Sequence, residues 1–206
     1  MAFELCGTQY GGFLVDFSLV EEGSTIISAG VGEDISFDIE LINKKNCNVI
    51  GIDPTPKSHV FVENFPNLKN YKLIKSALHT IDGEIIQMYK NKRDDHVSES
   101  ILPTHAAVKE YDSYYSDTIS LQTLFEQNKN ISILKMDVEG AEYEVLGHLE
   151  KIPETIKQIC LEFHHFCTDK NIEDTKQIIQ KMKDFGFDNL IENPSGKSLA
   201  ELTLWR

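Results

Sequence analysis

The chain has 206 residues, with 20 Lys and Arg against 33 Asp and Glu, and a formal net charge of −13. This length suits one domain, and a hydrophobic content of 41% is enough for a core, which excludes an intrinsically disordered chain. The acidic balance disfavours nucleic acid and anionic membrane as partners, because both attract clustered Lys and Arg.

Short β-rich runs alternate with amphipathic stretches, which is typical of an α/β fold with a parallel sheet and crossover helices. Strands are predicted at 25–28, 48–52, 71–75, 85–89, 132–136 and 158–162. Helices are predicted after Asp34, with Ile35, Ile39 and Ile42 on one stripe, and at 56–65, 121–128, 141–149 and 172–185. Runs at 187–191 and 199–205 flank a turn at 193–196 and predict a C-terminal antiparallel hairpin.

These elements predict a single domain over residues 1–206, with an N-terminal segment at 1–24. Residues 90–118 are polar and without a clear period, so we interpret them as a loop or lid on the substrate side. The four cysteines form no CxxC pair, and neither a signal peptide nor an apolar run of ~20 residues is found. We therefore expect a cytoplasmic protein without a membrane span.

The turn after the first strand is the most informative local motif. Gly30 and Gly32 are spaced GxG where a buried strand meets a helix, which suits a close approach by a ligand. A dinucleotide motif requires a third glycine, but Ile35 occupies that position. Glu33 and Asp34 would also repel a pyrophosphate. A cofactor with a cationic centre and no phosphate, such as S-adenosylmethionine (SAM), fits better.

Asp53 ends the second strand, ~20 residues after the glycines, where a carboxylate can accept both ribose hydroxyls of an adenosyl cofactor. The alternative is a simple Asp-Pro turn with no ligand. Ser76 and Ala77 follow the third strand and are predicted to border the adenine.

Three carboxylates follow the strand at 132–136, where open α/β sheets bind ligands. Asp137 ends that strand directly. Glu139 and Glu142 lie one helical turn apart, and the alternative role for them is to complement the dipole of the next helix.

His164 and His165 follow the strand at 158–162 and lie at the same edge of the sheet. An imidazole there could accept the proton of a substrate hydroxyl, or join Asp137 and Glu139 as a metal ligand. Adjacent histidines point apart, so at most one is expected to act. A divalent metal is compatible with these carboxylates, but the spacing gives no complete ligand set and no metal ligand is predicted. His105, in the polar middle segment, is expected to be solvated.

Several stretches together resemble the FkbM family of SAM-dependent methyltransferases. They are SAGVGEDISFDIELI at 28–42, GIDPTPKS at 51–58, LKMDVEGAEYEVL at 134–146 and LEFHH at 161–165, with YGGF at 10–13 and HVS at 96–98. The resemblance implies the class I methyltransferase fold, which is Rossmann-like and doubly wound, with a mostly parallel seven-stranded sheet and a C-terminal antiparallel hairpin.

The resemblance and the motifs together assign roles to individual residues. The predicted cofactor-binding residues are Ser28, Ala29, Gly30, Gly32, Asp53, Ser76, Ala77 and Asp137. The predicted substrate-binding residues are Tyr10, His96, Ser98, Glu139 and His165. His164 is the first candidate for a catalytic base and Asp137 the second.

The predicted function is a SAM-dependent O-methyltransferase acting on a hydroxyl of a sugar or glycan, with S-adenosylhomocysteine (SAH) as the product. One alternative is a non-sugar, polyketide-like acceptor. Another is a non-catalytic SAM-binding module of a larger glycan-building enzyme. A nicotinamide oxidoreductase is disfavoured by Ile35 in the place of the third glycine.

Overall fold

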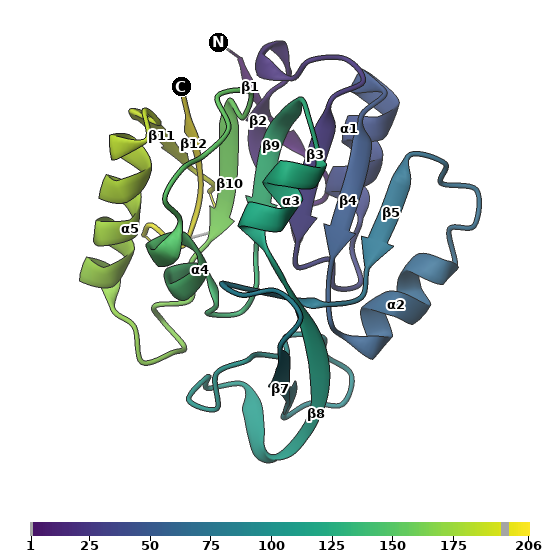
Figure 1. The fold of residues 1–206 in the computed structure, drawn as a ribbon, viewed down its shortest axis with the longest axis vertical. Helices are drawn as coiled ribbons and strands as arrows, with labels where there is room; N and C mark the ends of the chain where they lie inside the picture. The colour runs from purple at the N-terminus through teal and green to yellow at the C-terminus, as the bar shows by residue number, and fades with distance from the viewer. Residues whose placement is uncertain (1, 195–197) are drawn as a thin grey trace.

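The computed structural model describes residues 2–194 and 198–206 and contains a mixed sheet of seven strands (Figure 1). Its strands are β3 (Thr25–Ala29), β4 (Asn48–Ile52), β5 (Tyr71–Ile74), β9 (Ile131–Met136), β10 (Gln158–Glu162), β11 (Asn189–Glu192) and β12 (Glu201–Trp205). They lie in the order β11-β12-β10-β9-β3-β4-β5. Strands β3, β4, β5, β9 and β10 are parallel, whereas β12 pairs antiparallel with both β10 and β11.

The sheet is covered on both faces because side chains alternate along its central strands. The helices are α1 (Ser36–Lys45), α2 (Pro56–Glu63), α3 (Leu121–Gln127), α4 (Glu142–His148) and α5 (Ile172–Asp184). Ile27 of β3 and Leu134 of β9 belong to the core shared with α3, α4 and α5. The neighbouring residues Ile26 and Ile133 belong to a second core, shared with α1 and with the hairpin of β1 (Phe3–Cys6) and β2 (Phe13–Asp16).

A second, three-stranded sheet lies beyond the carboxyl ends of the parallel strands (Figure 1). It consists of β6 (Ala77–His79), β7 (Ile85–Asn91) and β8 (Val108–Ser120), in the order β6-β8-β7. Residues 92–107 connect β7 to β8 and reach back over the main sheet, so this subdomain forms one wall of the site described below.

The predicted α/β class is confirmed, and the predicted strands at 48–52 and 158–162 coincide with β4 and β10. The interpretation of residues 90–118 as a loop is wrong in part, because β7 extends to Asn91 and residues 108–118 belong to β8. Exposed and partly buried positions are mixed along β8, so its polar residues do not alternate regularly. Part of the turn predicted at 193–196 lies outside the described residues.

The predicted apolar stripe of the first helix is confirmed only in part. Ile35 is buried and Ile42 packs partly buried against the core, but Ile39 is half-buried, and the buried residues within the helix are Phe37, Asp38 and Leu41. The packing partner selects this face, because the Phe13 ring of β2 lies 6.1 Å from the Phe37 ring. The hairpin that supplies this partner was not predicted from the sequence.

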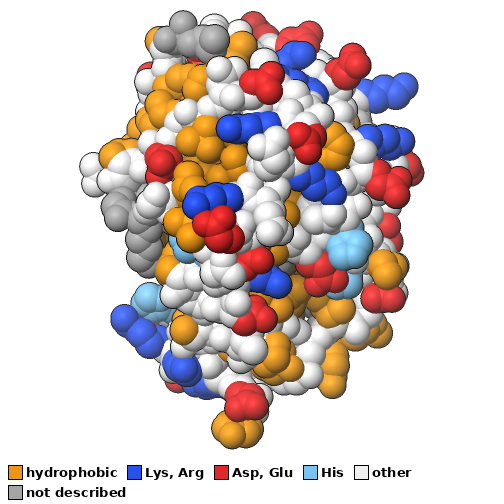
Figure 2. Space-filling model, turned by 90° about the vertical axis from the view of Figure 1, so that its left-hand side faces the viewer, with side chains coloured by type: hydrophobic (Ala, Val, Ile, Leu, Met, Phe, Trp, Pro, Cys, Tyr) orange, Lys and Arg blue, Asp and Glu red, His pale blue; other side chains and the backbone are white. Residues whose placement is uncertain are grey.

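On the face where α5 lies, acidic and basic side chains are interspersed (Figure 2). Among the described residues, no helix has both the length and the apolar character needed to cross a bilayer.

Candidate active site

A cavity of about 670 Å³ lies at the carboxyl ends of β3, β4, β9 and β10, between the main sheet and the 92–107 segment. This volume falls within the range of small-molecule and cofactor sites. Residues of the main sheet and of the 92–107 segment line it. They include the glycine turn, Asp53, Ala77, Leu78 and residues 137–139.

The glycine turn is required by a close approach of two backbones. Gly30 has φ +80°, and a Cβ added there would lie 1.6 Å from the carbonyl oxygen of Asp137. The Asp137 N–H donates to the Ala29 carbonyl at 3.0 Å, and the buried ammonium of Lys135 donates to the Gly30 carbonyl at 2.6 Å. Gly32 has φ +56° but more room, since its Cβ would meet only Val97 Cγ2 at 3.5 Å.

Asp53 holds this turn in place. Its Oδ2 accepts the N–H groups of Val31 and Gly32, each at 2.9 Å, and its Oδ1 accepts the Thr55 N–H at 2.7 Å. The carboxylate is buried at the cavity wall. Asp53 therefore shapes the cavity, in addition to any contact that it makes with a ligand.

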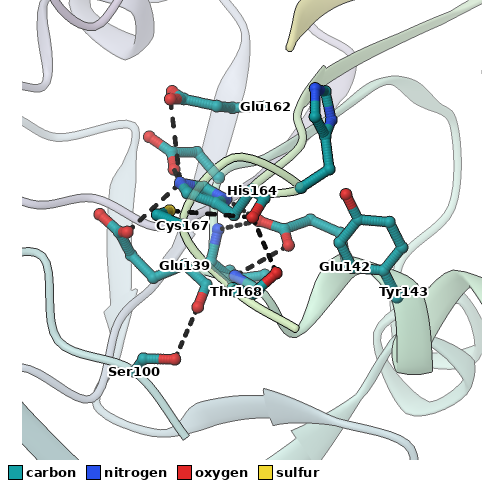
Figure 3. A network of polar contacts seen from close by, with 12 residues as sticks. Ser100, Glu139, Glu142, Tyr143, Glu162, His164, Cys167 and Thr168 are labelled. Atoms are coloured by element: carbon teal, nitrogen blue, oxygen red, sulfur yellow. Dashed lines mark hydrogen bonds and ion pairs between the residues drawn. The ribbon is translucent and has the colours of Figure 1, made fainter. Parts of the chain in front are cut away.

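His164 is the centre of a polar network at the other end of the cavity (Figure 3). Its Nδ1 lies 2.9 Å from Glu142 Oε1, and Glu142 is fully buried. The two oxygens of Glu142 also accept the N–H groups of Val138 at 3.0 Å and Gly140 at 2.9 Å. An ionised carboxylate only accepts hydrogen bonds, so it fixes the proton on Nδ1 and leaves the Nε2 lone pair of the neutral imidazole available.

Three further carboxylates surround His164 Nε2. Its distances are 3.3 Å to Glu139 Oε2, 3.7 Å to Asp137 Oδ1 and 3.8 Å to Glu162 Oε1. Burial alone would lower the pKa of His164, but Glu142, Glu139 and Asp137 raise that pKa well above its usual value. The imidazolium form is therefore stabilised by its surroundings.

The carboxylates of this cluster titrate differently from one another. Burial raises the pKa of Asp137 to about 6 and that of Glu162 to about 8, and for Glu162 the charge of Asp137 adds to the shift. Burial would raise the pKa of Glu139 as well, but its hydrogen bond to His105 and the charge of His164 lower it. The cluster thus combines one readily ionised carboxylate with two that ionise at higher pH.

We expect Glu162→Gln to stabilise the protein at alkaline pH. The folded chain keeps the Glu162 proton up to about pH 8, whereas the unfolded chain loses it near the ordinary pKa of a glutamate. Ionising Glu162 is therefore harder in the folded chain, and the free energy of unfolding of the wild type falls as the pH rises through this interval. Urea unfolding should show the variant more stable than wild type by about 1 kcal/mol or more at pH 8 and by less at pH 5. The exposed Glu110→Gln is the control, and an equal gain at both pH values would contradict this account.

Asp137, Glu162 and His164 are also the described residues that could hold a metal ion. One ligand atom from each lies within 4.8 Å of the others. Carboxylate oxygens and an imidazole suit a hard or borderline divalent cation, which would complete its coordination with water or substrate oxygens.

Most of the predicted site residues lie around this one cavity. Those that line it are Tyr10, Gly30, Gly32, Asp53, Ala77, His96, Ser98, Asp137, Glu139 and His164. Four others, Ser28, Ala29, Ser76 and His165, are not part of the lining. Ser28 and Ala29 are buried in β3, on its two opposite faces, and His165 Nδ1 contacts Thr175 Oγ1 of α5 at 3.1 Å. Cofactor or substrate contact by these four residues stays a prediction.

Several residues of the site were not predicted from the sequence. His105 was expected to be solvated, but it is buried, and its Nε2 lies 3.1 Å from Glu139 Oε2 and 3.2 Å from Cys167 Sγ. Glu162 was not singled out, although its position at the end of a buried strand was a usable signal. The sequence around His105 and Cys167 does not indicate that they belong to the site, because each lies in a loop that the fold brings to the cavity.

The family of the chain follows from comparison with known proteins. The methyltransferase FkbM domain matches residues 21–188. The chain therefore belongs to the FkbM family of SAM-dependent methyltransferases. No curated protein sequence matches the chain.

Two solved methyltransferase structures are similar to this chain, one over most of its length and the other over about a third. A SAM-dependent methyltransferase from Aquifex aeolicus is 14% identical, with a TM-score of 0.42, over 90% of this chain and 82% of that one. Coclaurine N-methyltransferase bound to N-methylheliamine and SAH is 12% identical, with a TM-score of 0.25. That match covers 37% of this chain and 37% of the N-methyltransferase, so it spans little more than a third of that enzyme.

Proposed function

We propose that this methyltransferase acts on oxygen, at a hydroxyl of a sugar or glycan, and releases SAH. The observation that carries the proposal is the orientation of His164, a residue of the cavity lining whose Nδ1 is fixed by buried Glu142, while its Nε2 lies among the carboxylates of Glu139, Asp137 and Glu162. A hydroxyl is a poor acid, so its methylation benefits from a positioned base that takes the proton.

The cavity fits the cofactor that the family uses. Asp53 presents a carboxylate beside the glycine turn, and Ala77, Leu78 and Met88 supply an apolar wall suited to an adenine ring. When bound, SAM supplies a methyl group already activated by its sulfonium centre. The protein then needs to align the acceptor and receive its proton.

The chain's own residues can do both. Neutral His164 accepts the hydroxyl proton at Nε2, and the imidazolium that forms is stabilised by Glu142 on one side and Glu139 on the other. Tyr10, which is largely exposed, and Ser98 are the proposed acceptor contacts at the mouth. A neutral polyol suits these acidic walls better than a phosphorylated acceptor, which the carboxylates would repel.

Calorimetric titration with SAH tests the cofactor, and mass spectrometry of sugars incubated with SAM tests the acceptor. We expect wild type to bind SAH with a micromolar Kd and Asp53→Ala to bind at least about tenfold more weakly, because a charge-assisted hydrogen bond is lost. The same change leaves three backbone N–H donors without their acceptor. Unfolding must therefore be measured in parallel, with the exposed Asp188→Ala as the control.

The possible outcomes separate the hypotheses. A mass gain of one methyl group on a sugar hydroxyl supports the proposal. Tight SAH binding without transfer to any glycan supports a non-catalytic SAM-binding module, and transfer to other hydroxyl compounds supports a non-sugar acceptor. Absence of SAH binding by the folded wild type contradicts the proposal as a whole.

A further inference from the structure

Asp53 has too few free acceptor sites to hold a ribose alone. A carboxylate offers about four lone-pair positions. Three of those on Asp53 already accept the N–H groups of Val31, Gly32 and Thr55. About one remains, whereas the ribose of an adenosyl cofactor presents two hydroxyl donors. If Asp53 keeps the glycine turn in place, the second hydroxyl needs another acceptor.

The segment between β7 and β8 provides one at Glu99, which lines the cavity. Its Oε2 and the Tyr114 hydroxyl are both buried, and the two side chains interact with each other. A carboxylate has about four lone-pair positions, so the interaction with Tyr114 leaves acceptor capacity on Glu99 unused. A ligand hydroxyl in the cavity can donate to it.

Glu99 lies on the Asp53 side of the cavity. The Tyr114 hydroxyl interacts with both Glu99 and Thr55, and Thr55 is the residue whose N–H Asp53 accepts. Burial raises the pKa of Glu99, and the charge of Asp53 contributes in the same direction. The two carboxylates are thus near enough to influence each other, as two acceptors for one diol must be.

The backbone around Glu99 is held on both sides, so its position is fixed before any ligand binds. The Lys57 ammonium of α2 donates to the His96 carbonyl at 3.0 Å, and the Asn91 amide donates to the Ser98 carbonyl at 3.0 Å. The Ser100 hydroxyl donates to the Glu139 carbonyl at 2.6 Å. Such anchoring lowers the entropic cost of placing an acceptor opposite the sheet.

We propose that Glu99 is a second ribose-binding carboxylate, which takes from the cofactor the hydroxyl that Asp53 cannot accept. The 92–107 segment then contributes to cofactor binding as well as covering the cavity. This inference rests on the proposed use of an adenosyl cofactor at Asp53.

Calorimetry with SAH and with its 2′-deoxy and 3′-deoxy analogues tests the inference. We expect Glu99→Ala to raise the Kd of SAH about tenfold or more, since a charge-assisted hydrogen bond is removed. In wild type each deoxy analogue should bind more weakly than SAH. In Glu99→Ala the loss of one of the two hydroxyls should cost no further affinity, because its acceptor is already gone. Glu110→Gln and an unchanged thermal unfolding midpoint are the controls.

Two results would overturn the inference without affecting the proposed function. One is unchanged SAH affinity in Glu99→Ala. The other is an equal loss of affinity for SAH and both analogues, which would mean that Glu99 acts on the cavity without contacting the ribose. Failure of wild type itself to bind SAH would instead remove the proposed function, and this inference with it.

Discussion

Gly30→Ala is expected to abolish SAH binding and to destabilise the fold. The new Cβ would lie 1.6 Å from the Asp137 carbonyl oxygen, and this oxygen belongs to backbone that cannot move aside as a side chain can. The φ of +80° adds a strain that glycine does not have. We expect the free energy of unfolding to fall by about 3 kcal/mol or more, measured by urea denaturation.

Gly32→Ala is the matched control, two residues further along the same turn. Its φ of +56° is also left-handed, but its Cβ would meet Val97 Cγ2 at an ordinary contact distance of 3.5 Å. The expected cost is therefore only the conformational one, about 1–2 kcal/mol. Equal losses for the two variants would mean that left-handed strain, and not the approach of Asp137, makes Gly30 necessary.

Gly30 and Gly32 could be identified from the sequence, but the reason why glycine is required at position 30 could not. The spacing of Gly30 and Gly32 correctly indicated a turn at the cavity, because tight turns at strand ends have a local signature. The reason for Gly30 is not local, since β9 pairs with β3 and brings Asp137 against it from far along the chain. The sequence contains both residues but not the contact between them.

The site residues that were not predicted were missed for the same reason. The pattern of apolar residues identified the strands of the main sheet, because these strands are buried along most of their length. It failed in residues 92–107 and along β8, where burial comes from contacts with distant elements. Glu99 and His105 are polar residues in a polar segment and look solvated until the segment closes over the cavity. Glu142 was ambiguous between the helix dipole and the site. The structure shows that its oxygens hold both backbone N–H groups and His164.

His164→Ala is expected to lower kcat for methyl transfer by about 10²–10⁴-fold, the contribution of a positioned base, with the Kd of SAH changed only a few-fold. The wild-type kcat should rise with pH above neutrality. The reason is that a base must be unprotonated, and Glu142, Glu139 and Asp137 raise the pKa of His164 well above its usual value. A pH profile of kcat under saturating SAM and acceptor measures this.

Glu142→Gln separates the positioning of the imidazole from its basicity. The amide keeps an oxygen near Nδ1 but removes the charge that contributes most to raising the His164 pKa, so the rising limb of kcat should move to lower pH. A variant that only disturbs the fold would lower kcat without moving the limb. A flat pH profile in wild type would rule out His164 as the base.

If chelation by EDTA abolished activity and added Mg²⁺ restored it, Asp137, Glu162 and His164 would instead act as metal ligands, since their ligand atoms already lie within 4.8 Å of one another.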